Sequence, residues 1–225
     1  MYKTIIFDFD GTLCSSITTI ASALQHTFIH FGYPAPSMAS ISKMCASGPN
    51  LHDTFTLLDP SLESLDKKTF DEWCVFYRTE YNKMAEHQCH LYPHVEQMLF
   101  QLKERGLELL IVSQKNKSSI EHALERFKIT QFFSEIFGEI LAHPGKPDPY
   151  LFEHEILPSR PSHRQSDFLM VGDTSVDIQF AKNCGIDVAW AEYGYGDIPK
   201  DLLESITFHL HAPMDLVSEL NKKTS

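Results

Sequence analysis

Two aspartates separated by one residue follow the first apolar run of the sequence. Asp8 and Asp10 come directly after the apolar residues 5–7, and Gly11 and Thr12 come next. Side chains two residues apart leave a strand on the same face, so both carboxylates would adjoin buried apolar residues. Two such carboxylates repel each other unless a cation lies between them, and Mg²⁺ prefers carboxylate, carbonyl and water oxygens. The pair therefore favours a magnesium site, although Asp10-Gly11 could also simply form a turn.

A second apolar run, residues 167–171, is also followed by acidic residues. Asp173 comes two positions after it, and Asp177 lies in the helical pattern beyond. Taken alone, Asp173 or Thr174 could cap that helix, and Asp177 could favour its positive end. If this strand lies beside the first one, however, Asp173 points to the same edge of the sheet as Asp8 and Asp10. These three carboxylates then converge on one metal ion.

Ser113 and Lys146 are candidates for holding an anion. Ser113 ends an apolar run, residues 107–112, and precedes a helical pattern, so its hydroxyl and the following N–H groups could bind an anion. Lys146 lies in a loop stiffened by prolines, next to a helix start at Asp148. A chance serine and a solvated surface lysine are the ordinary alternatives. The positions of both residues favour an anion site.

Short apolar runs bounded by turn residues predict buried strands, and amphipathic patterns between them predict helices. Strand alternating with helix from about residue 90 onward implies an α/β fold, with a Rossmann-like parallel sheet covered by helices on both faces. The predicted strands are residues 4–7, 107–112, 167–171, 187–191 and, more weakly, 206–210, and the predicted helices are residues 94–105, 118–127, 149–157, 176–184 and 213–221.

The segment from residue 15 to residue 89 breaks this alternation, because it contains successive helical patterns and no convincing strand. Apolar side chains spaced by three and four residues, from Phe70 to Met84, form one stripe that predicts the core of an inserted subdomain. We therefore predict a catalytic core of residues 1–14 and 90–225 and a helical cap of residues 15–89.

Charge and cysteine content narrow the class of protein. Thirty acidic against nineteen basic residues give a formal net charge of -11, which would repel nucleic acid or an anionic membrane. A small phosphorylated ligand would need local positive charge from a metal, a lysine or backbone N–H groups. No apolar stretch approaches the roughly 20 residues that span a bilayer. We expect a cytoplasmic protein with reduced, mostly buried thiols at Cys14, Cys45, Cys74, Cys89 and Cys184.

The motifs taken together resemble those of a known family. In order along essentially the whole chain, they resemble the four motifs of the haloacid dehalogenase superfamily. The helical insertion and the sequence around Tyr92 and Lys146 resemble the phosphoglycolate phosphatase-like group of that superfamily. The matching residues are Asp8, Asp10, Gly11 and Thr12, then Ser113, then Lys146, then Gly172, Asp173 and Asp177.

The resemblance implies a role for each carboxylate. Asp8 would be the nucleophile, and Asp10 would protonate the leaving oxygen and then activate water against an aspartyl phosphate. This division agrees with the chemistry, since a carboxylate needs no deprotonation to attack, whereas a leaving alkoxide needs a proton. Mg²⁺ would be bound by the Asp8 and Asp173 carboxylates and the Asp10 backbone carbonyl, with Asp177 as a ligand or a support.

The resemblance also implies a set of substrate-binding residues. Ser113, the Gln114 N–H and Lys146 would hold the transferring phosphoryl oxygens, and Gly11 and Thr12 would contribute to the same site. Relatives often carry Asn at the position of Gln114. If this residue contributes only its N–H group, the change is harmless; if its side chain orients the substrate, specificity could differ.

A phosphatase is the function that the resemblance favours, because a dehalogenase is expected to lack the second aspartate, Asp10. The substrate would be a small phosphorylated metabolite such as phosphoglycolate, with pyrophosphate, sugar phosphates and nucleoside monophosphates open. A sugar phosphomutase would use the same Asp8, Asp10 and metal. A binding or regulatory protein that kept the fold and lost the reaction is the alternative from a different class.

Substrate choice is expected to lie in the cap, because the core contacts serve the shared phosphate. The turn of residues 47–49 is predicted to face the site, with an ordinary turn between helices as an equal alternative. His87, Cys89, His90 and His94 lie close together in the sequence. They could suggest zinc, but they match no standard ligand spacing.

Overall fold

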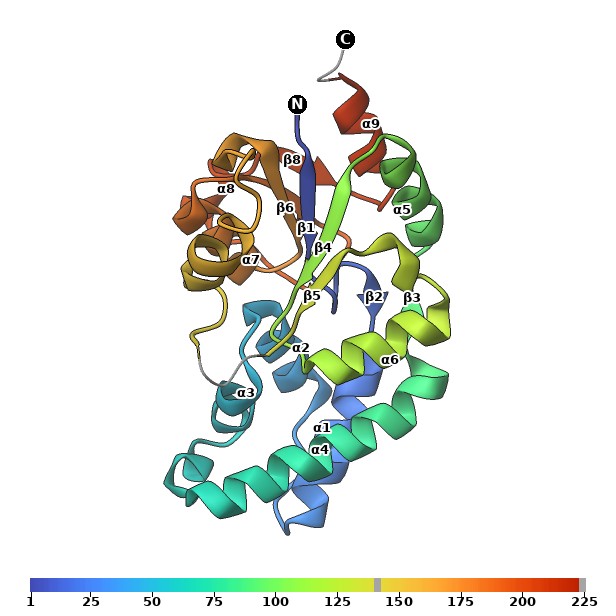
Figure 1. Cartoon of the computed structure of the whole chain (residues 1–225). Helices are drawn as coiled ribbons and strands as arrows, with labels where there is room; N and C mark the ends of the chain where they lie inside the picture. Colours follow the sequence, from blue (N-terminus) through green and yellow to red (C-terminus); the bar gives the residue numbers. More distant parts are fainter. Residues whose placement is uncertain (140–142, 223–225) are drawn as a thin grey trace.

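A parallel six-stranded sheet forms the centre of the computed structural model shown in Figure 1, which describes residues 1–139 and 143–222. The strand order is β5-β4-β1-β6-β7-β8, and every neighbouring pair is parallel. This arrangement confirms the predicted α/β core with a Rossmann-like sheet. The strands are β1 (Thr4–Phe7), β4 (Glu108–Val112), β5 (Glu135–Phe137), β6 (Phe168–Gly172), β7 (Asp187–Ala191) and β8 (Phe208–Leu210).

All five predicted strands are present, and the structure adds a sixth, β5, that the sequence did not reveal. β5 has only three residues at the edge of the sheet, beginning with the exposed Glu135. So short a strand offers too few positions for an apolar pattern. It nevertheless pairs with the full second half of β4 and so extends the sheet beside Ser113.

Helices cover both faces of the sheet, as predicted. Ile5 and Phe7 of β1 pack into one apolar cluster together with side chains of α5, α6 and α9. Ile6, which points to the opposite face, packs with side chains of α7 and α8 and of the helical turn Phe152–Ile156. Among the described residues, no helix is long and apolar enough to cross a membrane. The helices are α5 (Val95–Glu104), α6 (Lys117–Phe127), α7 (Ser175–Cys184), α8 (Lys200–Leu203) and α9 (Asp215–Lys222).

The segment between β1 and β4 is helical apart from two short strands, as the sequence predicted. Figure 1 shows its helices gathered beyond one end of the sheet. The strands β2 (Cys14–Ser15) and β3 (His90–Leu91) pair antiparallel where the chain leaves and re-enters the core. We call residues 15–89 the helical insertion; its treatment as a separate cap domain stays a prediction. Its helices are α1 (Ile17–His30), α2 (Met38–Ser47), α3 (Leu51–Leu58), the 3₁₀ turn Pro60–Ser64 and α4 (Lys67–Gln88).

The apolar stripe on α4 serves two cores rather than one. Phe70 and Trp73 pack inside the insertion, against side chains that include Phe28 and Phe55. Tyr81, about two helical turns beyond Trp73, packs instead with the cluster that contains Ile5 and Phe7 of the sheet. The prediction that the whole stripe forms the core of the insertion was therefore wrong for its C-terminal part, which joins the insertion to the core.

Cys14 and Cys89 form a disulfide, which contradicts the prediction that all the thiols are reduced. The two residues are 75 positions apart in the sequence, and their Cα atoms lie 6.7 Å apart beside the β2–β3 pair. Only folding of the intervening helices brings them together, so no sequence spacing could reveal the pair. Cys45, Cys74 and Cys184 remain free and buried, as predicted.

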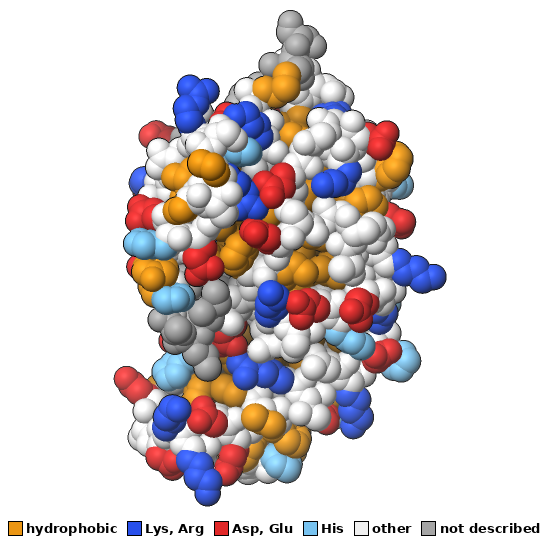
Figure 2. All heavy atoms as spheres, viewed as in Figure 1, with side chains coloured by type: hydrophobic (Ala, Val, Ile, Leu, Met, Phe, Trp, Pro, Cys, Tyr) orange, Lys and Arg blue, Asp and Glu red, His pale blue; other side chains and the backbone are white. Residues whose placement is uncertain are grey.

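Figure 2 shows one face of the molecule, viewed as in Figure 1. On this face, acidic and basic side chains are interspersed over both the core and the helical insertion. A mixed surface of this kind differs from the clustered lysines and arginines with which proteins track a phosphate backbone.

Replacement of Phe28 by alanine tests the core of the insertion. Phe28 is 1% exposed and its ring contacts Trp73 and Phe55. The Phe28→Ala protein should lose about 3–5 kcal/mol of unfolding free energy, measured by urea denaturation. Its neighbour Ile29 is 61% exposed, so Ile29→Ala should change the free energy by no more than about 0.5 kcal/mol. Equal losses in the two proteins would contradict this packing.

Candidate active site

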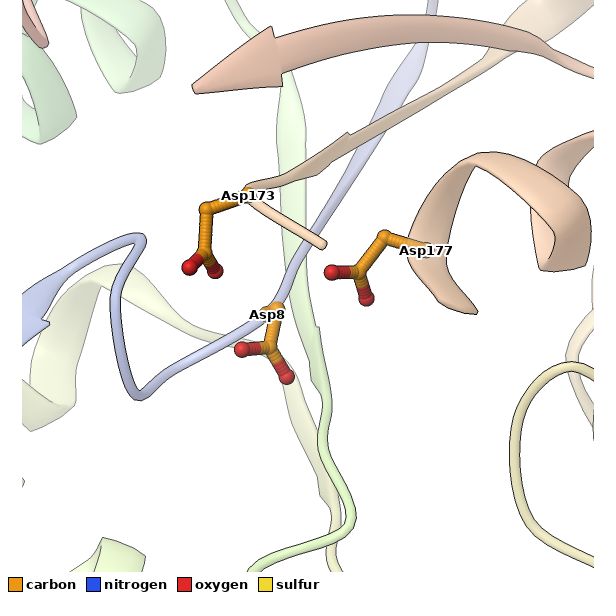
Figure 3. A group of neighbouring side chains, drawn as sticks. All are labelled: Asp8, Asp173 and Asp177. Carbon is orange, nitrogen blue, oxygen red and sulfur yellow. The ribbon is translucent and has the colours of Figure 1, made fainter. Parts of the chain in front are cut away.

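Three buried aspartates converge at the carboxyl end of the sheet. β1 and β6 are neighbours in register, with Phe7 opposite Val171, so Asp8 and Asp173 leave the same edge. Asp177 reaches the same point from the first turn of α7. One oxygen of each carboxylate lies within 4.8 Å of the others, and Figure 3 shows the three side chains facing one another. Asp8 and Asp173 therefore converge as predicted, but the third carboxylate of the group is that of Asp177 and not that of Asp10.

The cluster carries more negative charge than its surroundings balance. Burial raises the pKa of Asp8 to about 6, with Lys146 opposing the rise and Asp177 adding to it. Burial, then the charges of Asp177 and Asp8, raise the pKa of Asp173 well above its usual range. Each shift reflects the cost of holding a buried anion beside other anions. An all-oxygen donor set with this excess of charge fits a hard divalent cation such as Mg²⁺.

Lys146 provides the ammonium group of the cluster. Its Nζ donates to Asp8 Oδ1 at 2.7 Å and to Asp177 Oδ1 at 2.5 Å, and the side chain is buried. Burial lowers the pKa of Lys146, but the charges of Asp177 and Asp8 outweigh this effect and raise it. The lysine therefore stays charged beside Asp8, as expected of a positioned cation.

Asp177 is both a helix cap and a member of the cluster. Its Oδ2 accepts hydrogen bonds from the backbone N–H and the hydroxyl of Thr174, at 3.0 and 2.8 Å, in a capping box at the start of α7. Its Oδ1 accepts from Lys146. The predicted place of Asp177 at the helix start is therefore present, and its role as a metal ligand or support stays a prediction.

Gly11 and Thr12 position Asp173. The Thr12 hydroxyl donates to Asp173 Oδ1 at 2.9 Å, and the backbone N–H of Tyr195 donates to Oδ2 at 2.9 Å. Gly11 has a φ of +88°, and a Cβ atom there would lie 2.1 Å from Asp173 Oδ2. Only glycine therefore allows Asp173 to approach so closely. Direct contact of Gly11 or Thr12 with a substrate stays a prediction.

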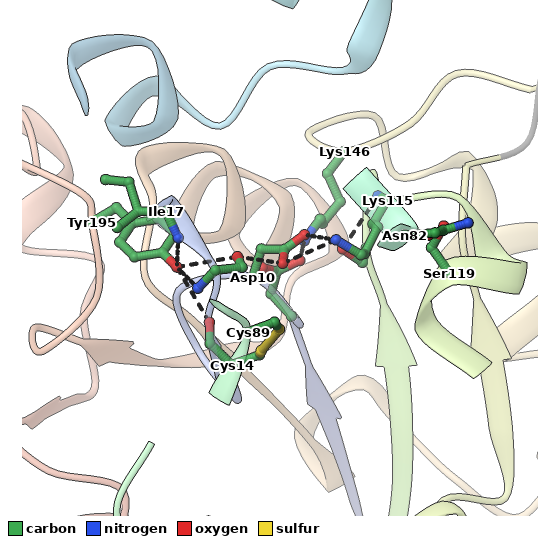
Figure 4. A network of polar contacts seen from close by, with 12 residues as sticks. Asp10, Cys14, Ile17, Asn82, Cys89, Lys115, Ser119, Lys146 and Tyr195 are labelled. Atoms are coloured by element: carbon green, nitrogen blue, oxygen red, sulfur yellow. Dashed lines mark hydrogen bonds and ion pairs between the residues drawn. A yellow bond between two sulfur atoms is a disulfide. The ribbon is translucent and has the colours of Figure 1, made fainter. Parts of the chain in front are cut away.

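The Asp10 carboxylate lies outside the cluster, in a different environment. Its Oδ1 accepts from Ser16 Oγ at 2.5 Å, and Lys115 Nζ donates to Oδ1 at 3.2 Å and Oδ2 at 2.9 Å (Figure 4). Lys115 also lies 3.7 Å from the centre of the Tyr81 ring. Lys115 is not among the predicted site residues, although it lies only two positions after Ser113. The predicted metal contact through the Asp10 backbone carbonyl stays a prediction.

Ser113 and Gln114 extend the site from the end of β4. The Ser113 hydroxyl is buried and accepts from the backbone N–H of Lys115 at 3.4 Å. The Gln114 side-chain amide donates to the backbone carbonyls of Gly48, at 2.7 Å, and Lys146, at 3.3 Å. The Gln114 side chain therefore links the core to the helical insertion, and its effect on substrate choice stays a prediction.

A cavity of about 140 Å³ lies between the cluster and the insertion. Since water occupies about 30 Å³ per molecule in the liquid, this space suits a ligand of several heavy atoms. Gly48 and Pro49 line it, so two residues of the predicted turn 47–49 face the site. The core lining includes Asp8, Asp10, Ser113, Gln114, Lys115 and Lys146, and the insertion adds Met44, Cys45, Tyr77, Arg78 and Tyr81.

The alternative zinc site is contradicted. Cys89 is bonded to Cys14 and so cannot act as a thiolate ligand. Among the described residues, Asp8, Asp173 and Asp177 are the only group of three that could hold an ion. His94 has another role, since it adopts a φ of 67° at the start of α5.

The family follows from comparison with known proteins. Residues 5–191 match the haloacid dehalogenase-like hydrolase family, and the chain belongs to this family of hydrolases. It is 33% identical over 202 residues to phosphoglycolate phosphatase from Vibrio cholerae, covering 86% of this chain and 85% of that one. It is 30% identical over 196 residues to pyrophosphatase PpaX from Oceanobacillus iheyensis, covering 84% of each chain.

A solved structure agrees with this assignment. The chain superposes with a TM-score of 0.83 on the crystal structure of a predicted phosphoglycolate phosphatase from Haemophilus somnus. The two chains are 25% identical, and the match covers 97% of this chain and 98% of the other. The arrangement of core and helical insertion is therefore shared along nearly the whole length.

Replacement of Gly11 by alanine tests the close approach to Asp173. Gly32 provides a matched control, because its φ is +81° but a Cβ there would meet nothing within 4 Å. Gly32→Ala should cost about 1 kcal/mol of unfolding free energy through backbone strain alone. Gly11→Ala should cost roughly 2 kcal/mol more, because Asp173 cannot move without losing its bonds to Thr12 and Tyr195. Urea denaturation measures both values, and equal losses would contradict the predicted clash.

Proposed function

We propose that the protein is a magnesium-dependent phosphatase that hydrolyses a small phosphate monoester through an aspartyl phosphate formed on Asp8. The observation that carries this proposal is the separation of the two carboxylates of the first motif. Asp8 lies in the charged cluster beside Lys146, whereas Asp10 is bound by Lys115 and Ser16 at the cavity. Two carboxylates in distinct environments suit two roles, one as nucleophile and one in proton transfer.

In the first half of the reaction, a carboxylate oxygen of Asp8 attacks phosphorus and the ester P–O bond breaks. Asp10 gives its proton to the leaving oxygen, which departs as an alcohol. Lys146 stays charged beside Asp8, and with Ser113 it can bind the oxygens of the transferring phosphoryl group. Both side chains are buried at the cavity and so are held in place before the substrate arrives.

In the second half, Asp10 takes a proton from a water molecule, whose oxygen attacks the same phosphorus. The bond between phosphorus and Asp8 breaks, which releases phosphate and restores the Asp8 carboxylate. Mg²⁺ held by Asp8, Asp173 and Asp177 would neutralise charge on the phosphoryl oxygens. Lys115 remains positioned to stabilise Asp10 when it is ionised between the two steps.

Phosphoglycolate is the first substrate to test, since the relative from Vibrio cholerae is a phosphoglycolate phosphatase. Pyrophosphate is the second, because a pyrophosphatase is almost equally similar along the chain. Both substrates present a terminal phosphoryl group to the same nucleophile. A phosphomutase using the same residues would instead need a bisphosphate for turnover.

Phosphate release by the Asp8→Asn protein tests the proposed nucleophile. With Mg²⁺ and a panel of small phosphate esters and pyrophosphate, the variant should release phosphate at least about 10³-fold more slowly than the unaltered protein, because an amide cannot form the acyl phosphate. The exposed Asp71→Asn is the matched control and should behave as the unaltered protein does. Turnover retained by Asp8→Asn would contradict the proposal, and turnover that requires a bisphosphate would indicate a mutase.

Metal binding can be tested without any activity. Mg²⁺ at a hundred times its dissociation constant should stabilise the protein by about 2.7 kcal/mol in thermal unfolding, and a chelator should remove that gain. Asp173→Asn should lose most of the gain, because it removes a ligand. In chelator the same variant should be at least as stable as the unaltered protein, since it removes a buried charge next to Asp8 and Asp177. An undiminished response of Asp173→Asn to Mg²⁺ would exclude this site.

A further inference from the structure

Arg78 brings a positive charge from the helical insertion to the wall of the cavity. It lies on α4, its side chain is 31% exposed, and it lines the same cavity as Asp8 and Asp10. Nη2 donates to the carboxylate of Glu139, which belongs to the segment after β5. Nε is buried and has no hydrogen-bond partner among the described residues. A buried guanidinium N–H without a partner is costly and points to a missing acceptor.

The other two cations of the cavity have partners among the reacting groups. Lys146 binds Asp8 and Asp177, and Lys115 binds both oxygens of Asp10. Arg78 is the cation that the insertion contributes to the cavity lining, and the insertion is expected to choose the substrate. Arg78 can therefore bind a part of the ligand other than the transferring phosphoryl group.

The surroundings of Arg78 strengthen its attraction for an anion. Tyr77, Tyr81 and Met44 line the cavity from the same insertion, and such apolar walls keep a charged contact from being screened by water. Glu139 is held by its own backbone, whose N–H donates to the carbonyl of Lys115 at 2.8 Å. The ion pair thus fixes the guanidinium at the cavity while leaving Nε without a partner.

We propose that Arg78 determines specificity by binding a second anionic group of the substrate, a carboxylate or a second phosphate, while the first phosphoryl group lies at Asp8. This inference rests on the proposed function and adds its substrate class: phosphate compounds with a second negative charge. A guanidinium can bind a carboxylate or phosphate through two parallel N–H groups while another of its donors holds Glu139. Ligands with an uncharged tail leave Nε unpaired and bind less well.

Kinetics of Arg78→Met with three substrates test this assignment. Phosphoglycolate and pyrophosphate carry the second anionic group, and ethyl phosphate lacks it. The ratio of kcat/KM for either charged substrate to that for ethyl phosphate should fall about 10- to 100-fold in Arg78→Met. Arg78→Lys, which keeps the charge, should restore part of the ratio. If Arg78 binds a carboxylate but not a second phosphate, the Arg78→Met change should lower the ratio for phosphoglycolate and not for pyrophosphate. The experiment therefore distinguishes the two kinds of anion.

A matched control is available on α6. Arg126 also joins core and insertion, since it donates to the backbone carbonyls of Glu86 and Cys89, but it is not among the residues that line the cavity. Arg126→Met should leave the ratio unchanged. If Arg78→Met lowers kcat/KM for all three substrates equally, the Arg78–Glu139 pair serves only to join core and insertion, and the proposal is wrong.

Binding to the Asp8→Asn protein separates this inference from the proposed function. In calorimetry with Mg²⁺, phosphoglycolate and pyrophosphate should bind more tightly than ethyl phosphate, and the additional Arg78→Met change should remove that preference. Preference without turnover in the unaltered protein would refute the phosphatase while supporting the role of Arg78. Turnover with no preference for a second anionic group would refute the role of Arg78 alone.

Discussion

Repulsion among three buried carboxylates, only two of which bond to a lysine, is the constraint around which this structure is organised. Asp8, Asp173 and Asp177 lie together where water cannot screen them, and Lys146 offsets only part of their charge. Such an arrangement opposes folding, so the rest of the protein must hold it in place. The same imbalance makes the site attractive to a divalent cation, so the feature that costs stability also supplies the chemistry.

The sheet provides the rigidity that this arrangement requires. β1 and β6 are buried neighbours with helices on both faces, and each apolar cluster fixes one side of the strands that end in the aspartates. Close contacts then set the positions of the carboxylates. Gly11 leaves room for Asp173, and Thr12 and Tyr195 each donate to one of its oxygens. These contacts prevent the three carboxylates from moving apart to reduce their repulsion.

Contacts from three directions join the helical insertion to the same site. The Tyr195 hydroxyl accepts from the backbone N–H groups of Ser16 and Ile17, where α1 begins (Figure 4). Gln114 donates to Gly48 at the end of α2, and Arg78 of α4 pairs with Glu139 of the core. A shift of the insertion relative to the core would therefore change the positions of the residues around Asp10 and along the cavity wall. This coupling suits a site in which the core supplies the chemistry and the insertion selects the ligand.

The sequence by itself determined the parts of the protein that are local in the chain. Apolar runs ending in acid revealed β1 and β6 and the residues Asp8, Asp10 and Asp173, because a strand and the residues after it are contiguous. The same reasoning gave the parallel sheet and the helical insertion, since their patterns span many residues. Ser113 and Lys146 were found because each adjoins a strand end or helix start.

Tertiary structure alone decided which distant residues became partners. The disulfide joins cysteines 75 positions apart, and the Tyr195 hydroxyl accepts from the backbone N–H of Ser16, 179 positions away. No local sequence pattern can predict pairs with such separations. Lys115 and Arg78 look like ordinary charged residues until the fold brings one to Asp10 and the other to the cavity. The apolar stripe of α4 was visible in the sequence, but only packing divided it between two cores, because periodicity shows which face is buried and not what covers it.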